Sequence, residues 1–298
     1  MNQPAREQAG RGQAIRDGIA SRGLVHAMSA HNPLSARLAE EAGFDAIWAS
    51  GFELSAAYGI PDASLLSLTQ HLEMTRAICD SVALPVIADI DTGYGNAINV
   101  MHVVAAYERA GAGAVVMEDK RFPKDTSLLE GGRQELVGVA EFQGKIEAAA
   151  AARRDPSLVV VARTEALIAG LGQAEALARA HAYVEAGADM ILVHSKQKTP
   201  DEVLSFIAAW DGRAPIVLVP TAYPQLTEAA MRESGKIGVV IYGNHAIRAA
   251  VTAMQQVFRQ IRAEGGIAGA DAAIVSVEEI FRLQGVPAMK ADEARYLR

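Results

Sequence analysis

The chain has 298 residues, of which 50% are hydrophobic and 21% are charged, a composition that excludes bulk disorder and allows a large buried core. The formal net charge of -7, without any run of Lys and Arg, argues against a nucleic-acid partner, and no stretch of 18 apolar residues predicts a membrane span. The single cysteine, Cys79, excludes an intrachain disulfide.

The N-terminal segment is polar. Residues 1–20 contain Arg, Gln and Gly and lack the apolar core of a secretory signal, so we expect a flexible tail and a cytoplasmic protein. Residues 21–298 are then expected to form a single domain.

Short apolar runs alternate with segments whose apolar residues recur at helical spacing. The predicted strands are residues 24–28, 46–50, 86–89, 114–118, 158–163, 190–194, 216–219 and 238–242. The predicted helices are residues 33–42, 67–81, 97–110, 139–153, 173–186, 201–210, 226–234 and 244–263. Eight such units predict a (β/α)8 TIM barrel, whereas an open doubly wound sheet is the alternative that periodicity leaves open. Residues 276–283 predict a further amphipathic helix beyond the barrel.

One connection is unusually long. Residues 119–137 are rich in Lys, Pro, Asp, Gly and Arg and separate a predicted strand from its helix. Long loops in compact domains are typically lids or binding loops, so we expect a lid here. A second insertion, residues 57–64, follows the second predicted strand.

Acidic residues gather where two neighbouring strands end. Asp89 and Asp91 leave the same face of an extended segment, and Glu118 ends the next strand. Functional groups of a barrel stand at these carboxyl ends, and an all-oxygen set suits Mg²⁺ or Mn²⁺. The alternative is a pair of turn-forming aspartates before Thr92.

Basic residues provide candidate anion contacts. Lys124, Arg133 and Arg163 are the candidates, and Arg163 lies on a predicted strand, where a buried guanidinium needs an anionic partner. An internal ion pair with Glu165 is the alternative. His194 also ends a predicted strand, where it is either a functional group or a hydrogen-bonded core histidine.

Several motifs in order resemble the phosphoenolpyruvate mutase / isocitrate lyase superfamily. They are AHNPLSARLAEEAGFDAIWASG (30–51), DIDTGYGN (89–96), MEDKRFPKDTS (117–127), VARTEALIAG (161–170), ILVHSK (191–196) and VSVEEIFRLQ (275–284). The resemblance covers the chain from about residue 20 to its end. It implies a barrel whose last helix is swapped between subunits of a homotetramer, arranged as a dimer of dimers.

The lid motif separates branches of this superfamily. EDKxFPK is similar to the branch that handles phosphonopyruvate, whereas carbon–carbon lyases carry a cysteine in this lid. Mutases typically have Asn where this chain has Thr126. The resemblance therefore implies hydrolysis of the carbon–phosphorus bond of phosphonopyruvate to pyruvate and phosphate. The alternatives are a mutase that interconverts phosphonopyruvate and phosphoenolpyruvate, a more distant carbon–carbon lyase or decarboxylase, and a catalytically silent binding protein.

The resemblance also implies residue roles. It assigns direct Mg²⁺ binding to Asp89 and contact through water to Asp62, Asp91 and Glu118, with Mn²⁺ or Co²⁺ as substitutes. It places the substrate between Trp48, Ser50, Gly51 and Phe52 at the carboxylate end and Arg163 and His194 at the phosphonyl end. It gives catalytic roles to Asp62, Lys124, Thr126, Arg163 and His194, with Lys124 and Thr126 on the lid.

Overall fold

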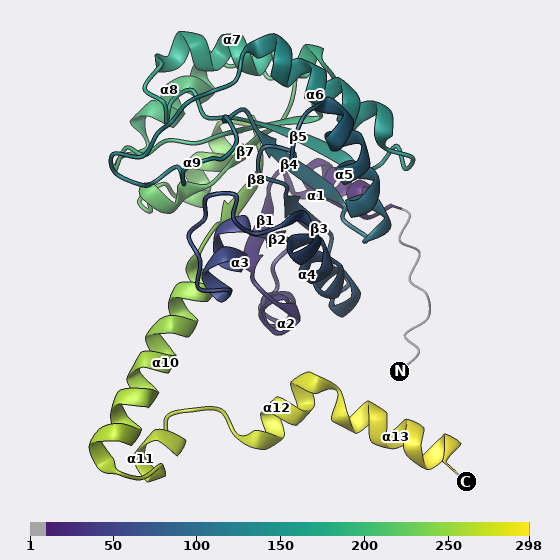
Figure 1. Ribbon diagram of the computed structural model, residues 1–298, viewed down its shortest axis with the longest axis vertical. Helices are drawn as coiled ribbons and strands as arrows, with labels where there is room; N and C mark the ends of the chain where they lie inside the picture. The colour runs from purple at the N-terminus through teal and green to yellow at the C-terminus, as the bar shows by residue number, and fades with distance from the viewer. Residues whose placement is uncertain (1–9, 298) are drawn as a thin grey trace. The chain divides into compact units, whose positions relative to one another are not determined.

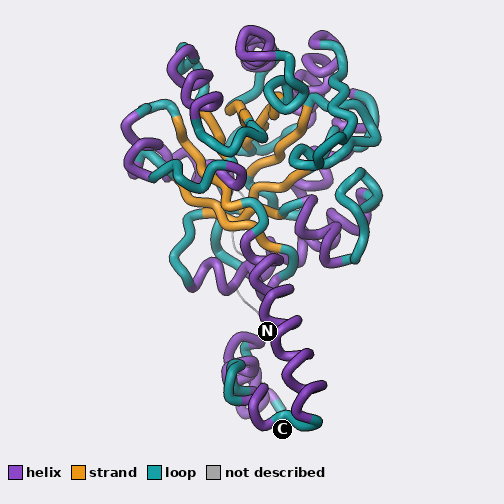
Figure 2. The backbone as a smooth tube through the Cα atoms, turned by 90° about the vertical axis from the view of Figure 1, so that its left-hand side faces the viewer, coloured by secondary structure: helices purple, strands orange, loops and turns teal. Residues whose placement is uncertain are grey.

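A computed structural model describes residues 10–297 and contains a closed barrel of eight parallel strands, in which each strand pairs with its neighbours in chain order and β8 pairs with β1 (Figures 1 and 2). The strands are β1 (Val25–Ala30), β2 (Ala46–Ala49), β3 (Val86–Asp89), β4 (Ala114–Glu118), β5 (Val159–Thr164), β6 (Met190–Val193), β7 (Ile216–Leu218) and β8 (Ile237–Tyr242). The predicted TIM barrel is confirmed, and the open-sheet alternative is excluded.

Helices surround the barrel (Figure 1). They are α2 (Pro33–Glu41), α3 (Gly51–Ala57), α4 (Leu68–Ser81), α5 (Ala97–Arg109), α6 (Val139–Ala152), α7 (Gly172–Glu185), α8 (Asp201–Ala209), the 3₁₀ turn η1 (Pro220–Ala222) and α9 (Glu228–Glu233). Short polar residues fix several helix starts: the side chains of Asn32, Ser67 and Asn96 each accept a hydrogen bond from a backbone amide of the first turn. The short α3, which begins after Ser50, was not predicted.

The strands are buried on both faces, as a parallel barrel requires. In β4, Ala114 and Val116 point into the barrel interior, whereas Val115 and Met117 join the core between the sheet and the helices. This alternation follows from the pleat of the strand. Continuous apolar runs of this kind are the reason that the sequence pattern predicts the strands well.

A helix before β1 closes the amino-terminal end of the barrel. Residues 11–20 were predicted to be a flexible tail, but α1 (Arg11–Arg22) is helical; residues 1–9 lie outside the described part of the chain. Ile15 of α1 is fully buried and packs into the barrel interior. Arg11 donates hydrogen bonds to the carbonyl oxygens of Gly111 (3.1 Å), just after α5, and Cys79 (2.9 Å), in the last turn of α4.

The described chain forms two compact units. The barrel unit ends at His245, and a C-terminal unit begins at Ala246. The helices of the C-terminal unit are α10 (His245–Glu264), α11 (Ala268–Asp271), α12 (Val277–Gln284) and α13 (Val286–Tyr296).

Residues 119–137, here called the lid loop, leave the end of β4 and return to it. An antiparallel bridge joins Lys120 to Leu136, and the amide of Val137 donates to the carbonyl of Asp119 at 2.9 Å. The two ends of the loop are therefore paired, while its middle extends over the carboxyl end of the barrel.

Candidate active site

A cavity of about 310 Å³ opens at the carboxyl end of the strands. The predicted site residues that line it are Trp48, Ser50, Phe52, Asp62, Asp89, Lys124, Thr126, Arg163 and His194. The lining residues to which the sequence pattern gave no role are Ser127, Leu128, Leu129, Val219, Thr221, Gly243 and Asn244. All of these come from the lid loop or follow β7 and β8, and their position at or after the ends of predicted strands was the available signal.

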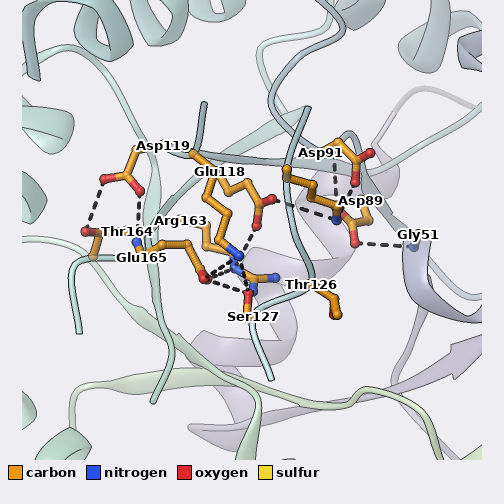
Figure 3. Close-up of polar contacts among 12 residues, drawn as sticks. Gly51, Asp89, Asp91, Glu118, Asp119, Thr126, Ser127, Arg163, Thr164 and Glu165 are labelled. Atoms are coloured by element: carbon orange, nitrogen blue, oxygen red, sulfur yellow. Dashed lines mark hydrogen bonds and ion pairs between the residues drawn. The ribbon is translucent and has the colours of Figure 1, made fainter. Parts of the chain in front are cut away.

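Three carboxylates surround the ammonium group of Lys124. Its Nζ atom lies 2.6 Å from Asp91 Oδ1, 3.2 Å from Asp62 Oδ1 and 3.7 Å from Glu118 Oε1. A fourth carboxylate, Asp89, lies next to Asp91, because its Oδ1 accepts a hydrogen bond from the amide of Asp91 at 3.2 Å (Figure 3). The predicted metal ligands are therefore brought together, and a lid residue supplies their positive partner in this structure.

The backbone of the turn after β3 allows the carboxylates to converge. Asp91 has a φ of 49°, in the left-handed region that is uncommon for residues other than glycine, and this orientation is the kind of strain that functional sites carry. Gly51 of α3 donates its amide to Asp89 Oδ2 at 3.3 Å. A β-carbon on Gly51 would lie 3.2 Å from that same oxygen and 3.3 Å from Asp91 Oδ1, so glycine permits this approach.

Asp62, Asp89, Asp91 and Glu118 are here called the acidic cluster. Because these carboxylates are largely buried and repel one another, a nearby cation stabilises their charged forms. Burial raises the pKa of Asp89, Asp91 and Asp62 above the ordinary range, although the charge of Lys124 opposes this rise. The same carboxylates outweigh the effect of burial on Lys124 and raise the pKa of its ammonium group. The lysine is therefore fully charged.

The donor set also fits a divalent cation. Among residues 10–297, no group of three His, Cys, Asp or Glu side chains already stands in a geometry that holds a metal. Magnesium does not require such a cage, since it retains several waters and commonly takes only one or two carboxylates. Glu118 Oε1 is buried without a hydrogen-bond partner among these residues, so an acceptor oxygen remains available beside Asp89 and Asp91.

Arg163 is both ion-paired and exposed to the cavity. Its Nε donates to Glu165 Oε1 at 2.5 Å and lies 3.4 Å from Glu118 Oε2, and its Nη2 donates to Ser127 Oγ at 2.8 Å (Figure 3). The internal ion pair that was the alternative for this residue is present. Because the guanidinium also lines the cavity, the pair positions its positive charge there.

His194 contributes a neutral imidazole to the cavity wall. It is 4% exposed, and its Nδ1 has no hydrogen-bond partner among the described residues. Burial, assisted by the charge of Arg163, lowers the pKa of His194 to about 4. A neutral ring with an unused nitrogen can donate or accept a hydrogen bond with a ligand.

Arg133 is the one candidate anion contact that the structure does not place in the cavity. Its side chain is exposed, and its amide donates to Asp125 Oδ2 at 2.7 Å within the lid loop. The lid loop therefore turns the side chain of Arg133 away from this cavity, and its contact with a substrate anion stays a prediction.

Fold and site together define a (β/α)8-barrel enzyme with an acidic cluster and a cationic wall at one end of the barrel. The chain belongs to the phosphoenolpyruvate phosphomutase family, whose model matches residues 16–262. The predicted superfamily membership is thus confirmed.

Individual relatives are similar over almost their whole length. The phosphonopyruvate hydrolase of Variovorax sp. (strain Pal2) is 64% identical over 96% of this chain and 99% of its own. The phosphoenolpyruvate phosphomutase of Tetrahymena pyriformis is 43% identical over 95% of this chain and 94% of its own. A crystal structure of phosphonopyruvate hydrolase in complex with oxalate and Mg²⁺ superimposes with a TM-score of 0.92 at 62% identity, covering 97% of this chain and 99% of that one.

Proposed function

We propose that this protein hydrolyses the carbon–phosphorus bond of phosphonopyruvate to pyruvate and phosphate. The observation that carries the proposal is a single cavity in which the acidic cluster faces Lys124, Thr126, Arg163 and His194. Such a cavity offers a carboxylate-lined site for a cation beside a positively charged site for a phosphonyl group. The 64% identity to a phosphonopyruvate hydrolase supports the same substrate.

The two ends of the substrate would bind opposite walls. Ser50, Gly51 and Phe52 at the start of α3 would hold the carboxylate and carbonyl end, with Trp48 beneath it. Arg163 and His194 would contact the phosphonyl oxygens, to which the guanidinium supplies charge and the neutral imidazole a hydrogen bond.

Magnesium is the proposed cofactor, with Mn²⁺ or Co²⁺ as substitutes. Asp89 would bind it directly, and Asp62, Asp91 and Glu118 would reach it through water. When bound, the cation supplies electrostatic stabilisation of the negative charge that develops on the organic part of the substrate.

The residues of the chain would then assist cleavage. The carbon–phosphorus bond breaks with its electrons left on carbon, where the adjacent ketone delocalises them as the pyruvate enolate, which later takes up a proton. Arg163 and Lys124 offset charge on the departing phosphoryl group, and Asp62 orients the Lys124 ammonium. Thr126, on the lid loop, would orient the water whose oxygen enters the phosphate.

Phosphorus NMR with isotopically labelled water tests this function. Incubation of the protein with phosphonopyruvate and Mg²⁺ in H₂¹⁸O should give pyruvate and phosphate that carries one ¹⁸O, and a chelator should stop the reaction. An enol phosphate signal in place of free phosphate would show instead the mutase activity that is the alternative function. Absence of either product would reject both.

We also propose that the protein assembles as a homotetramer, a dimer of dimers that exchanges its C-terminal helices. Val251, Met254 and Phe258 recur at helical spacing on α10, and each is more than two-fifths exposed. An apolar stripe of this kind is usually covered by another subunit. Light scattering should give a tetrameric mass, and Met254→Glu with Phe258→Glu should lower it.

No helix among residues 10–297 is long and apolar enough to cross a bilayer. We propose a cytoplasmic location, which fractionation of the source cells tests directly.

A further inference from the structure

The proposed mechanism has no role for Lys120 of the EDK motif, in which Glu118 belongs to the acidic cluster and Asp119 pairs with Arg179. Its ammonium group is almost fully buried. Nζ donates to the carbonyl of Asp125 and to Ser127 Oγ, both at 2.8 Å, and lies 3.2 Å from Glu165 Oε2. A buried lysine with three partners on two segments holds those segments together.

The hydroxyl of Ser127 joins these groups to the cavity wall. It donates its proton to Glu165 Oε2 at 2.6 Å and accepts hydrogen bonds from Lys120 and from Nη2 of Arg163, each at 2.8 Å (Figure 3). A serine hydroxyl has one donor and two acceptor positions, and all three are used. Ser127 therefore lacks a free position for substrate, although it lines the cavity.

Glu165 balances the two cations. Its Oε1 accepts from Arg163 Nε, and its Oε2 faces Lys120 and Ser127. Although burial acts in the opposite direction, the charges of Arg163 and Lys120 hold the pKa of Glu165 well below its ordinary value. The backbone amide of Glu165 donates a hydrogen bond to Asp119 Oδ1 at 2.9 Å, which fixes the backbone that carries the Glu165 carboxylate.

We propose that Lys120 and Glu165 are positioning residues that act through Ser127 to couple the placement of the lid loop to the orientation of the Arg163 guanidinium. We call Lys120, Ser127, Arg163 and Glu165 the clasp. Thr126 precedes Ser127, so the clasp also fixes the position of a lid residue that lines the cavity. The inference deepens the proposed function and rests on it for the identity of the substrate.

Two measurements on Lys120→Met and Glu165→Gln test the clasp. The first is the rate of trypsin cleavage after the exposed Arg121 and Arg133 in the folded protein, which should rise at least tenfold when the lid loop is released. The second is catalysis: kcat/KM for phosphonopyruvate should fall about 10- to 100-fold, as expected when a charged group is misplaced by about 1 Å.

Oxalate separates a positioning role from general damage. Oxalate resembles the carboxylate and carbonyl end of the substrate and lacks a phosphonyl group, so its inhibition constant should change less than twofold in these variants while KM for phosphonopyruvate rises. Arg153→Met is the matched control, since it breaks a 2.7 Å ion pair with Asp189 at the opposite end of the barrel. The control should lower stability without changing loop cleavage or kinetics.

Ser127 provides a second test if a charge deletion prevents folding. Ser127→Ala should release the lid loop, whereas Ser127→Thr, which retains the hydroxyl, should restore resistance to trypsin. The proposal is overturned if Lys120→Met and Ser127→Ala behave like Arg153→Met in both assays. Trypsin cleavage of the lid loop needs no substrate, so this measurement tests the clasp even if the wild-type protein does not hydrolyse phosphonopyruvate. A lack of hydrolysis by the wild type would reject the proposed function but not the clasp.

Discussion

Nζ of Lys124 lies 2.6 Å from Oδ1 of Asp91, so that an ion pair joins the lid loop to the turn after β3. Both side chains are largely buried. The ammonium therefore neutralises the carboxylates that we propose as magnesium ligands, and cation binding and lid position are electrostatically coupled.

Replacing Lys124 with Met should leave Asp62 and Asp91 without their positive partner, while Glu118 retains Arg163 at 3.4 Å. We expect the metal-free variant to lose about 3–5 kcal/mol of unfolding free energy, as when one partner of a buried ion pair is removed. Magnesium should then raise the melting temperature of the variant more than that of the wild type, and turnover should fall at least about 100-fold. Differential scanning calorimetry with and without Mg²⁺ measures the first effect.

The control for Lys124 is Lys236, a partly buried lysine far from the acidic cluster. Lys236 Nζ donates to the carbonyl oxygens of Ile207 (2.8 Å) and Ala208 (3.1 Å) at the end of α8. Lys236→Met should reduce stability and leave the response to Mg²⁺ unchanged. An equal response to Mg²⁺ in the wild type and the Lys124 variant would contradict the coupling.

Thr126→Asn should reduce hydrolysis of phosphonopyruvate. Thr126 lines the cavity. In the proposed mechanism its short hydroxyl orients a water molecule that the longer amide of Asn would displace. We expect kcat to fall about tenfold or more, and phosphorus NMR should show whether the phosphoryl group now reaches the enolate oxygen instead of water. Thr126→Ser is the matched control, since it keeps the hydroxyl; an unchanged rate in the Asn variant would exclude Thr126 as the determinant.

His71 should make stability depend on pH. Burial, assisted by Lys124, lowers the pKa of His71 to about 3, and its Nε2 has no hydrogen-bond partner among the described residues. The unfolded chain takes up this proton below about pH 6.5, whereas the folded protein does not until about pH 3. The contribution of His71 to the unfolding free energy is therefore full above pH 6.5. It falls by about 1.4 kcal/mol for each pH unit below that value.

Urea unfolding between pH 7 and pH 4 tests this slope. The unfolding free energy of His71→Gln should fall less steeply with decreasing pH than that of the wild type. His102 on α5 is exposed, so His102→Gln should retain the wild-type slope. Parallel curves for the wild type and His71→Gln would show that His71 does not control it.

Gly12 should be irreplaceable in α1. A β-carbon there would lie 2.0 Å from the carbonyl oxygen of Ser157 and 2.7 Å from that of Gly113, and neither backbone group can move freely. Gly12→Ala should therefore destabilise the protein by about 3 kcal/mol. Gly144→Ala, within α6 and with open space around the new carbon, should instead stabilise it by about 0.5–1 kcal/mol. Thermal unfolding of the two variants should show shifts of opposite sign.

The strand ends were predictable because a parallel barrel leaves little freedom in where they lie. Asp89, Glu118 and Arg163 each lie at or near the end of a buried apolar run. Closure of the barrel brings these strand ends together at its carboxyl end. Two interpretations of Arg163 were left open, and both apply, since it is ion-paired with Glu165 and also lines the cavity. The strand pattern identified the residue, but only the neighbouring side chains define its role.

Two features escaped prediction for physical reasons. The buried side of α1 is made mainly of Gly12, Ile15 and Gly18, and small residues leave no apolar stripe that periodicity can detect. The path of the lid loop depends on contacts with residues distant in sequence, such as Asp62 with Lys124 and Glu165 with Lys120. No local pattern encodes such contacts, so the clasp could not be expected from the motif alone.

Helix α1 also has a practical implication for protein engineering. It packs against the barrel floor through Ile15 and Arg11, while the cavity and lid loop occupy the opposite mouth. Replacing the loop between Asp119 and Val137 with a foreign loop would therefore leave the packing of α1 on the barrel unchanged. A chain that starts at Gly23 would instead lack α1 and its packing on the barrel, while it would retain every proposed catalytic residue.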